Sequence, residues 1–108
     1  MSNPFGLYDK SYTLMIEALK KFPEIEKAII FGSRSMGNYK KGSDIDLAIA
    51  GSGVTNQTVS RLSAQLNEEL PIPYFIDVVD YNSLLNKELK EHIDRNGTEF
   101  YHRKKQKS

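Results

Sequence analysis

Cysteine is absent from the 108 residues of this sequence. Its absence excludes a disulfide framework, a zinc site built on thiolates and a catalytic cysteine nucleophile. A chain without cysteine is compatible with a reducing cytoplasm.

Long apolar runs and an excess of one charge are also missing. No stretch approaches the length of a transmembrane helix, and residues 1–6 lack the basic and apolar regions of a signal peptide. The net charge of +1 gives no sign of binding to long polyanions, so these are not the default partner. Whether the protein binds nucleic acid stays open. We therefore expect a soluble, cytoplasmic protein with no membrane partner.

The length and composition indicate one small globular domain. Hydrophobic residues make up 39% of the chain and charged residues 27%, which is ordinary for a protein with a single modest core. We assign residues 1–101 to this domain and residues 102–108 to a basic, disordered tail. A domain of this size has little room for a separate substrate-binding lobe.

Hydrophobic periodicity predicts an α/β fold, a small mixed sheet backed by helices. Apolar residues at helical spacing predict helices over three ranges: 8–22, 55–69 and 82–95. Short apolar runs predict strands over three others: 28–31, 44–50 and 74–79. We expect Phe100 and Tyr101 to pack back onto the last helix.

The last predicted helix has the clearest end signals. Asn82 or Ser83 is expected as its N-cap, and Gly97 as its C-terminal stop. The side chains expected to point inward share its apolar side: Leu85, Leu89 and Ile93. His92 is assigned to the surface of this helix.

The stretch 31–47 carries the polar residues best suited to chemistry. Gly32 and Gly37 permit backbone conformations and close approaches that a Cβ would obstruct. Ser33 and Arg34 bring hydroxyl and guanidinium donors suited to phosphate oxygens. A strand followed by this turn, with a short helix beginning at Ser33, predicts a loop that binds an anion.

Asp44 and Asp46 open the second predicted strand, after a loop that contains Lys40 and Lys41. Strand alternation puts both carboxylates on one face of the sheet, where their charges repel. A divalent cation would remove this repulsion, and oxygen ligands suit magnesium. Asp77 interrupts the apolar third strand and is a candidate for a third carboxylate of the same site.

At this point the sequence resembles a known family. The Gly-Ser-Arg-Ser-x-Gly and Ser-Asp-Ile-Asp-Leu motifs look like the signature of the DNA polymerase β-like nucleotidyltransferases, and the short chain looks like their stand-alone "minimal nucleotidyltransferase" (MNT) members. The resemblance implies that Gly32, Ser33 and Arg34 bind the nucleotide. It also implies a set of catalytic, metal-binding carboxylates: Asp44, Asp46 and Asp77.

The implied reaction transfers a nucleoside monophosphate from an NTP, with ATP first among the candidates, to an acceptor hydroxyl. It depends on Mg²⁺, with two ions expected. Met36 departs from the family pattern, because members often carry Arg there. Minimal members are commonly found with a helical partner of the HEPN type, as antitoxin to a ribonuclease toxin, so we expect such a partner or a homo-oligomer.

Other interpretations stay open. Residues 32–37 also suit an ordinary strand-to-helix turn, and the aspartates a solvated strand face. A non-catalytic binding module that neutralises a helical partner by occlusion is one rival function, and an NTP sensor without transfer is another. We expect any protein partner to dock near Tyr8 and Tyr12 on the first helix and on the turn 71–74.

Overall fold

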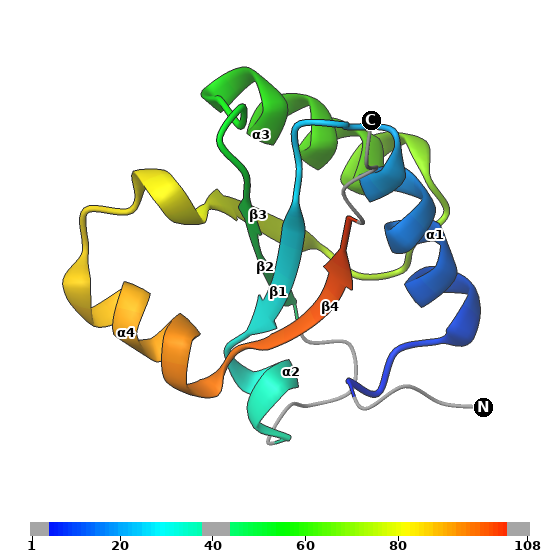
Figure 1. Ribbon diagram of the computed structural model, residues 1–108. Coiled ribbons are helices and arrows are strands. Elements are labelled where there is room, and N and C mark those ends of the chain that lie inside the picture. Colours follow the sequence, from blue (N-terminus) through cyan, green and yellow to red (C-terminus); the bar gives the residue numbers. More distant parts are fainter. Residues whose placement is uncertain (1–4, 38–43, 104–108) are drawn as a thin grey trace.

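The computed structural model describes residues 5–37 and 44–103, which form a four-stranded sheet with helices on both faces (Figure 1). The strands are β1 (Lys27–Phe31), β2 (Ile45–Ala50), β3 (Ile76–Asp80) and β4 (Thr98–His102), in the spatial order β3-β2-β1-β4. β1 is antiparallel to β2 and β4, whereas β2 and β3 are parallel. The predicted α/β fold with a mixed sheet is confirmed.

The helices are α1 (Asp9–Lys20), α2 (Ser33–Met36), α3 (Asn56–Ala64) and α4 (Lys87–Asn96). A π-helical turn, η1 (Gln65–Glu69), extends α3, and a 3₁₀ turn, η2 (Tyr81–Ser83), follows β3. Within residues 5–37 and 44–103, every helix is too short or too polar to cross a membrane.

The main core lies between one sheet face and α1, α3 and η1. Strand alternation selects this face, since Ile45, Leu47 and Ile49 of β2 are fully buried on it. From the helices, Leu19 of α1 and Leu62 of α3 pack against them. This half of the fold is closed, so a site must be sought on the other face.

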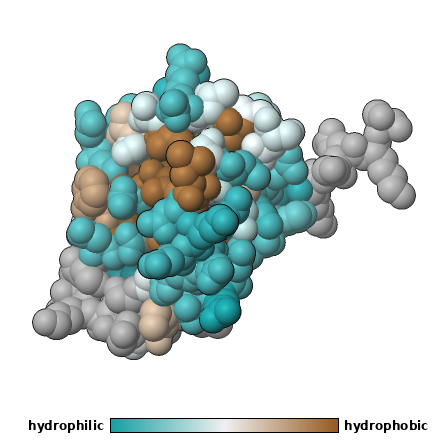
Figure 2. Space-filling view, turned by 90° about the vertical axis from the view of Figure 1, so that its left-hand side faces the viewer, coloured by the Kyte–Doolittle hydropathy of each residue, from teal (hydrophilic) through white to brown (hydrophobic). Residues whose placement is uncertain are grey.

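The second face is covered only in part. Phe31 and Ala48 pack there against Ile93 of α4, with a few partly buried apolar neighbours from the sheet and from η2. Leu85, in the connection between η2 and α4, is 95% exposed. On the side of the molecule where η2 and α4 lie, the surface shows a contiguous apolar area bordered by hydrophilic residues (Figure 2).

The last helix begins later than expected. Its N-cap is Asn86, whose Oδ1 accepts a hydrogen bond from Leu89 N at 3.1 Å, so α4 starts at Lys87 and not near residue 82. Residues 81–83 instead form η2, because the carboxylate of Asp80 accepts a bond from the amide of Asn82. Leu85 falls between the two elements, and the expectation that it points inward was wrong. The helix ends at Gly97 as predicted.

The strand β4 was not predicted. Phe100 contacts the rings of Phe5 and Tyr12 in the main core, at centroid distances of 6.2 and 5.8 Å, instead of packing onto α4. β4 includes His102, the first residue of the expected tail, and Arg103 N donates to Glu26 O at 2.8 Å. Residues 104–108 lie outside the described part.

Candidate functional site

A row of side chains crosses the partly covered sheet face at the start of β2. Asp46 pairs with Phe31 of β1 on one side and with Asp77 of β3 on the other. Directly paired residues project to the same face, so the carboxylates of Asp46 and Asp77 are neighbours. The exposed Asp44 lies two residues before Asp46, and its charge also acts on Asp46. The structure thus groups the three predicted aspartates.

The charge of Asp46 is opposed by its surroundings. Burial raises the pKa of Asp46, and the charges of Asp77 and Asp44 raise this pKa further. His92 acts in the opposite direction and lowers the pKa of Asp46. A cluster of like charges with one partial counter-charge favours the binding of a cation.

The glycine turn packs directly against the carboxylate of Asp46. Gly32 has a φ of +76°, a conformation that side-chain-bearing residues rarely adopt. A Cβ at this position would collide with Oδ2 of Asp46. Gly32 is therefore required both by its backbone angle and by the space that Asp46 occupies. Ser33 follows as the first residue of α2, whereas Lys40 and Lys41 lie outside the described residues.

Arg34 points into the protein. Its side chain is 1% exposed, and Nη1 donates to the carbonyl oxygens of Phe5 at 3.2 Å and Gly6 at 3.5 Å. The guanidinium also lies 4.9 Å from the ring centroid of Tyr74. A triphosphate contact would require Arg34 to leave these partners. In this structure Arg34 holds the N-terminal segment to the turn that follows β1.

His92 was expected on the helix surface, but it is half-buried beside the row. Its ring meets the Phe31 ring edge-on at 6.3 Å between centroids, and its Nδ1 lies 3.2 Å from Asn96 Nδ2. Because Phe31 pairs with Asp46, this contact places the imidazole near the carboxylates. The signal in the sequence was its spacing of three residues from Leu89, which puts both on one side of α4.

The donor set suits magnesium in kind, because all three candidate ligands supply carboxylate oxygens. No group of three or more His, Cys, Asp and Glu side chains in residues 5–37 and 44–103 is already arranged to hold a metal ion. Asp46 and Asp77 therefore share a face, with Asp44 just before β2, without forming a preorganised metal cage.

Solved structures show the same fold. A chain of a toxin–antitoxin complex crystallised with AMP-PNP matches with a TM-score of 0.70 and 25% identity, over 84% of this chain and 73% of that one. A chain of the complex between the tri-AMPylated Shewanella oneidensis HEPN toxin and the MNT antitoxin matches with a TM-score of 0.66 and 22% identity. The match covers 87% of this chain and 71% of that one. A chain of a MntA–HepT toxin–antitoxin complex matches with a TM-score of 0.66 and 20% identity, over 89% of this chain and 74% of that one.

Sequence comparison identifies the family. No curated protein sequence matches the chain. The family model described as "Polymerase beta, Nucleotidyltransferase" matches residues 14–106, a range that includes the glycine turn and all three aspartates. The chain therefore belongs to the polymerase β family of nucleotidyltransferases.

Proposed function

We propose that this protein transfers a nucleoside monophosphate from ATP or another NTP to a hydroxyl group, with release of pyrophosphate. The observation that carries this proposal is the strand register, which sets Asp46 beside Asp77 while the Gly32 turn packs against the Asp46 carboxylate. A triphosphate held at the turn would lie next to the carboxylates. Family membership supports a transferase reaction of this class.

The three aspartates are the proposed catalytic residues and metal ligands. Mg²⁺, when bound, would neutralise phosphate charge and polarise the reacting phosphoryl group. Asp44 and Asp46 are the principal ligands in this proposal, because a cation would relieve the repulsion that raises the pKa of Asp46. Asp77 is exposed. We propose that its carboxylate contributes to the metal site and also accepts the proton of the acceptor hydroxyl.

Nucleotide binding falls on Gly32 and Ser33. Gly32 lets the backbone approach the site closely, and Ser33 is the next residue along the turn. Arg34 acts indirectly, since its guanidinium is buried against Phe5 and Gly6. Its contribution to nucleotide binding is to hold the turn in place.

The proposed acceptor is a hydroxyl of a HEPN-type helical partner. One structural neighbour comes from a complex whose HEPN toxin carries AMP groups, and another from a toxin–antitoxin complex with AMP-PNP. The fold agrees with an acceptor presented by a second protein, because residues 5–37 and 44–103 form one sheet with its covering helices and no second lobe to bind an acceptor.

The direct test is incubation with the HEPN-type partner, Mg²⁺ and NTPs labelled at the α-phosphate. Label should move to the partner, and Asp46→Asn should reduce the rate by at least about a hundredfold. Glu68→Gln, which removes an exposed charge from η1, should leave the rate unchanged. Transfer at the wild-type rate by Asp46→Asn would contradict the proposed site.

Metal and nucleotide binding can be followed without turnover. Mg²⁺ plus NTP should raise the melting temperature of the wild-type protein, because a ligand that binds only the native state stabilises it. The shift should disappear in Asp44→Asn. An unchanged shift in that variant would remove Asp44 from the site.

Neutralisation by occlusion is the second candidate function, and the partly covered apolar face favours it. The Asp44→Asn variant separates the two functions. If the protein acts only by covering its partner, this variant should still suppress the partner's ribonuclease activity. If transfer is required, suppression should be lost.

A further inference from the structure

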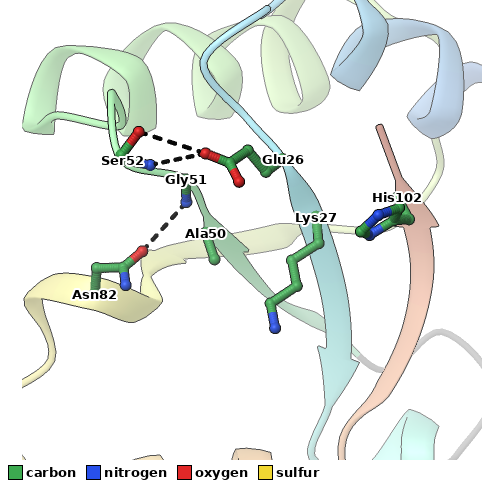
Figure 3. Close-up of a pocket in the computed structure, with 7 residues that line it drawn as sticks. All are labelled: Glu26, Lys27, Ala50, Gly51, Ser52, Asn82 and His102. Atoms are coloured by element: carbon green, nitrogen blue, oxygen red, sulfur yellow. Dashed lines mark hydrogen bonds between the residues drawn. The ribbon is translucent and has the colours of Figure 1, made fainter. Parts of the chain in front are cut away.

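A second polar site lies at the opposite end of the same sheet face. A cavity of about 390 Å³ opens there between the sheet and η2, and its lining includes the polar residues Glu26, Lys27, Asn82 and His102 (Figure 3). Ala50, at its floor, is four residues beyond Asp46 on β2. The rise of about 3.3 Å per strand residue separates the cavity from the carboxylates by roughly 13 Å. The two sites are therefore distinct.

Lys27 brings a positive charge to this cavity. In the register it pairs with Ala50 on one side and with His102 on the other. Its ammonium group has no ion pair with any residue in 5–37 or 44–103. Glu26 also lines the cavity, and its carboxylate oxygen Oε2 accepts bonds from Ser52 N at 3.2 Å and Ser52 Oγ at 3.4 Å, which holds it at the β2–α3 turn.

Asn82 adds neutral donors to this charge. Its Oδ1 accepts a hydrogen bond from Gly51 N at 3.2 Å, which assigns the oxygen and leaves the Nδ2 hydrogens without a partner among the described residues. Figure 3 shows Asn82, Lys27 and His102 arriving from η2, β1 and β4 around one space. Lys27 and Asn82 thus bring hydrogen-bond donors to the cavity from two separate elements, whereas Nδ1 of His102 lies 3.5 Å from the carboxylate of Glu99.

We propose that this cavity binds an oxyanion group, the phosphate or carboxylate of a small molecule. An ammonium and an amide N–H₂ are matched donors for such a group, and bonds to a charged acceptor are the strong ones. The volume exceeds that of a single phosphate, so the anionic group can belong to a larger metabolite. The inference stands apart from the proposed transfer reaction, since it uses none of the aspartates.

Titration of ¹⁵N-labelled protein followed by NMR tests the proposal. Inorganic phosphate and acetate serve as separate probes, with chloride keeping the ionic strength constant. Saturable shifts are expected for the amides of Gly51 and Ser52 and for the Asn82 side chain with at least one probe. The probe that saturates identifies the anion class. Shifts at Gly32 would report the nucleotide site and do not count.

Two variants and one control make the result decisive. Lys27→Met and Asn82→Asp should each weaken binding at least about tenfold, the effect of losing one charge-assisted hydrogen bond. Asn82→Asp keeps the acceptor for Gly51 N while it replaces the amide donors by a negative charge. Lys20→Met removes an exposed lysine from α1 and should bind like the wild type. Absence of saturation with both probes, or unchanged affinity in both cavity variants, would overturn the proposal.

Discussion

Asp46 carries a charge that destabilises the protein when no cation is bound. Its pKa is raised above the ordinary aspartate value of 3.8, chiefly by burial and further by the charges of Asp77 and Asp44. Between 3.8 and the raised native value, the native state binds more protons than the unfolded state. Stability therefore falls as the pH rises through this window, and the penalty is complete above it.

This sign predicts that Asp46→Asn stabilises the metal-free protein at neutral pH. The free energy of unfolding should rise by about 0.2–1 kcal/mol, the range for directly opposed side chains on neighbouring strands. The gain should shrink as the pH falls and vanish below the unfolded pKa. Urea unfolding from pH 7 downward measures it, with Glu68→Gln as control. A destabilised Asp46→Asn at pH 7 would contradict the repulsion.

Ser33 and Arg34 are adjacent, yet their variants should behave differently. Arg34→Ala should lower the free energy of unfolding by about 2–4 kcal/mol, because it leaves a cavity and deprives two carbonyl oxygens of a donor. Ser33→Ala should keep the stability and weaken NTP binding. Urea unfolding and calorimetric titration with NTP distinguish the two. Wild-type affinity in Ser33→Ala would place the phosphates elsewhere, and wild-type stability in Arg34→Ala would contradict its packing role.

Local patterns predicted part of the site and missed contacts between distant segments. Period-2 alternation placed Asp46 on the partly covered face, and the predicted strand around Asp77 is the one that pairs with it. Asp44 lies just before β2, and its charge acts on Asp46. The partners of Arg34 lie 28 and 29 residues earlier in the chain, so no motif could reveal them. Its guanidinium looked like a phosphate ligand for that reason.

At the scale of elements, η1 is hydrogen-bonded to the edge strand that carries Asp77. Asn67 in η1 accepts a bond from Ile76 N at 2.8 Å and donates to Ile76 O at 2.9 Å. Ile76 belongs to β3, which is one edge of the sheet in the described part of the chain. The amide of Asn67 thus takes the place of a neighbouring strand at the residue before Asp77.

Removing the two hydrogen bonds between Asn67 and Ile76 should destabilise the pairing of β3. Asn67→Ala should cost about 1–2 kcal/mol, since it deprives the backbone N–H and C=O of Ile76 of their partners. It should also accelerate hydrogen exchange of the Ile76 amide. Ser63→Ala is the matched control, because it removes the other partner of the Asn67 side chain, at 3.3 Å, and leaves Ile76 bonded. Equal exchange in both variants would show that Asn67 does not hold β3.

The C-terminal elements show where sequence patterns were insufficient. Asn82 and Asn86 are equally good N-caps in isolation. In the structure Asn82 N donates to Asp80 Oδ1 and the Asn82 side chain accepts from Gly51 N, so Asn86 caps the later start of α4. β4 lacks a regular alternation of buried and exposed residues, and its register with β1 shifts between Ala28 and Ile29. Such a strand depends on pairing with β1, which a local pattern cannot reveal.

At the scale of the whole molecule, the two sheet faces have different surroundings. Tyr8, on the main-core side, is 60% exposed, but its ring lies 6.0 Å from that of Tyr74, which in turn covers Arg34. The sequence placed partner docking in this region. The aspartates instead share their face with α4 and with the small apolar cluster around Phe31. An acceptor carried by a partner must reach that face.

We therefore predict that the proposed HEPN-type partner docks on the α4 side, with Leu85 in the contact. Leu85→Asp should weaken association at least about tenfold, because burying an unpaired carboxylate in an apolar contact is costly. The fold of the Leu85→Asp variant should be unaffected, since the Leu85 side chain is 95% exposed and has little packing to lose.

The control is Tyr8→Asp, a change of the same kind on the α1 side, which should associate like the wild type. Sedimentation velocity of each variant with the partner measures both. Normal association of Leu85→Asp together with loss in Tyr8→Asp would move the interface to the α1 side. A strict monomer with full transferase activity on the partner would show that stable docking is unnecessary.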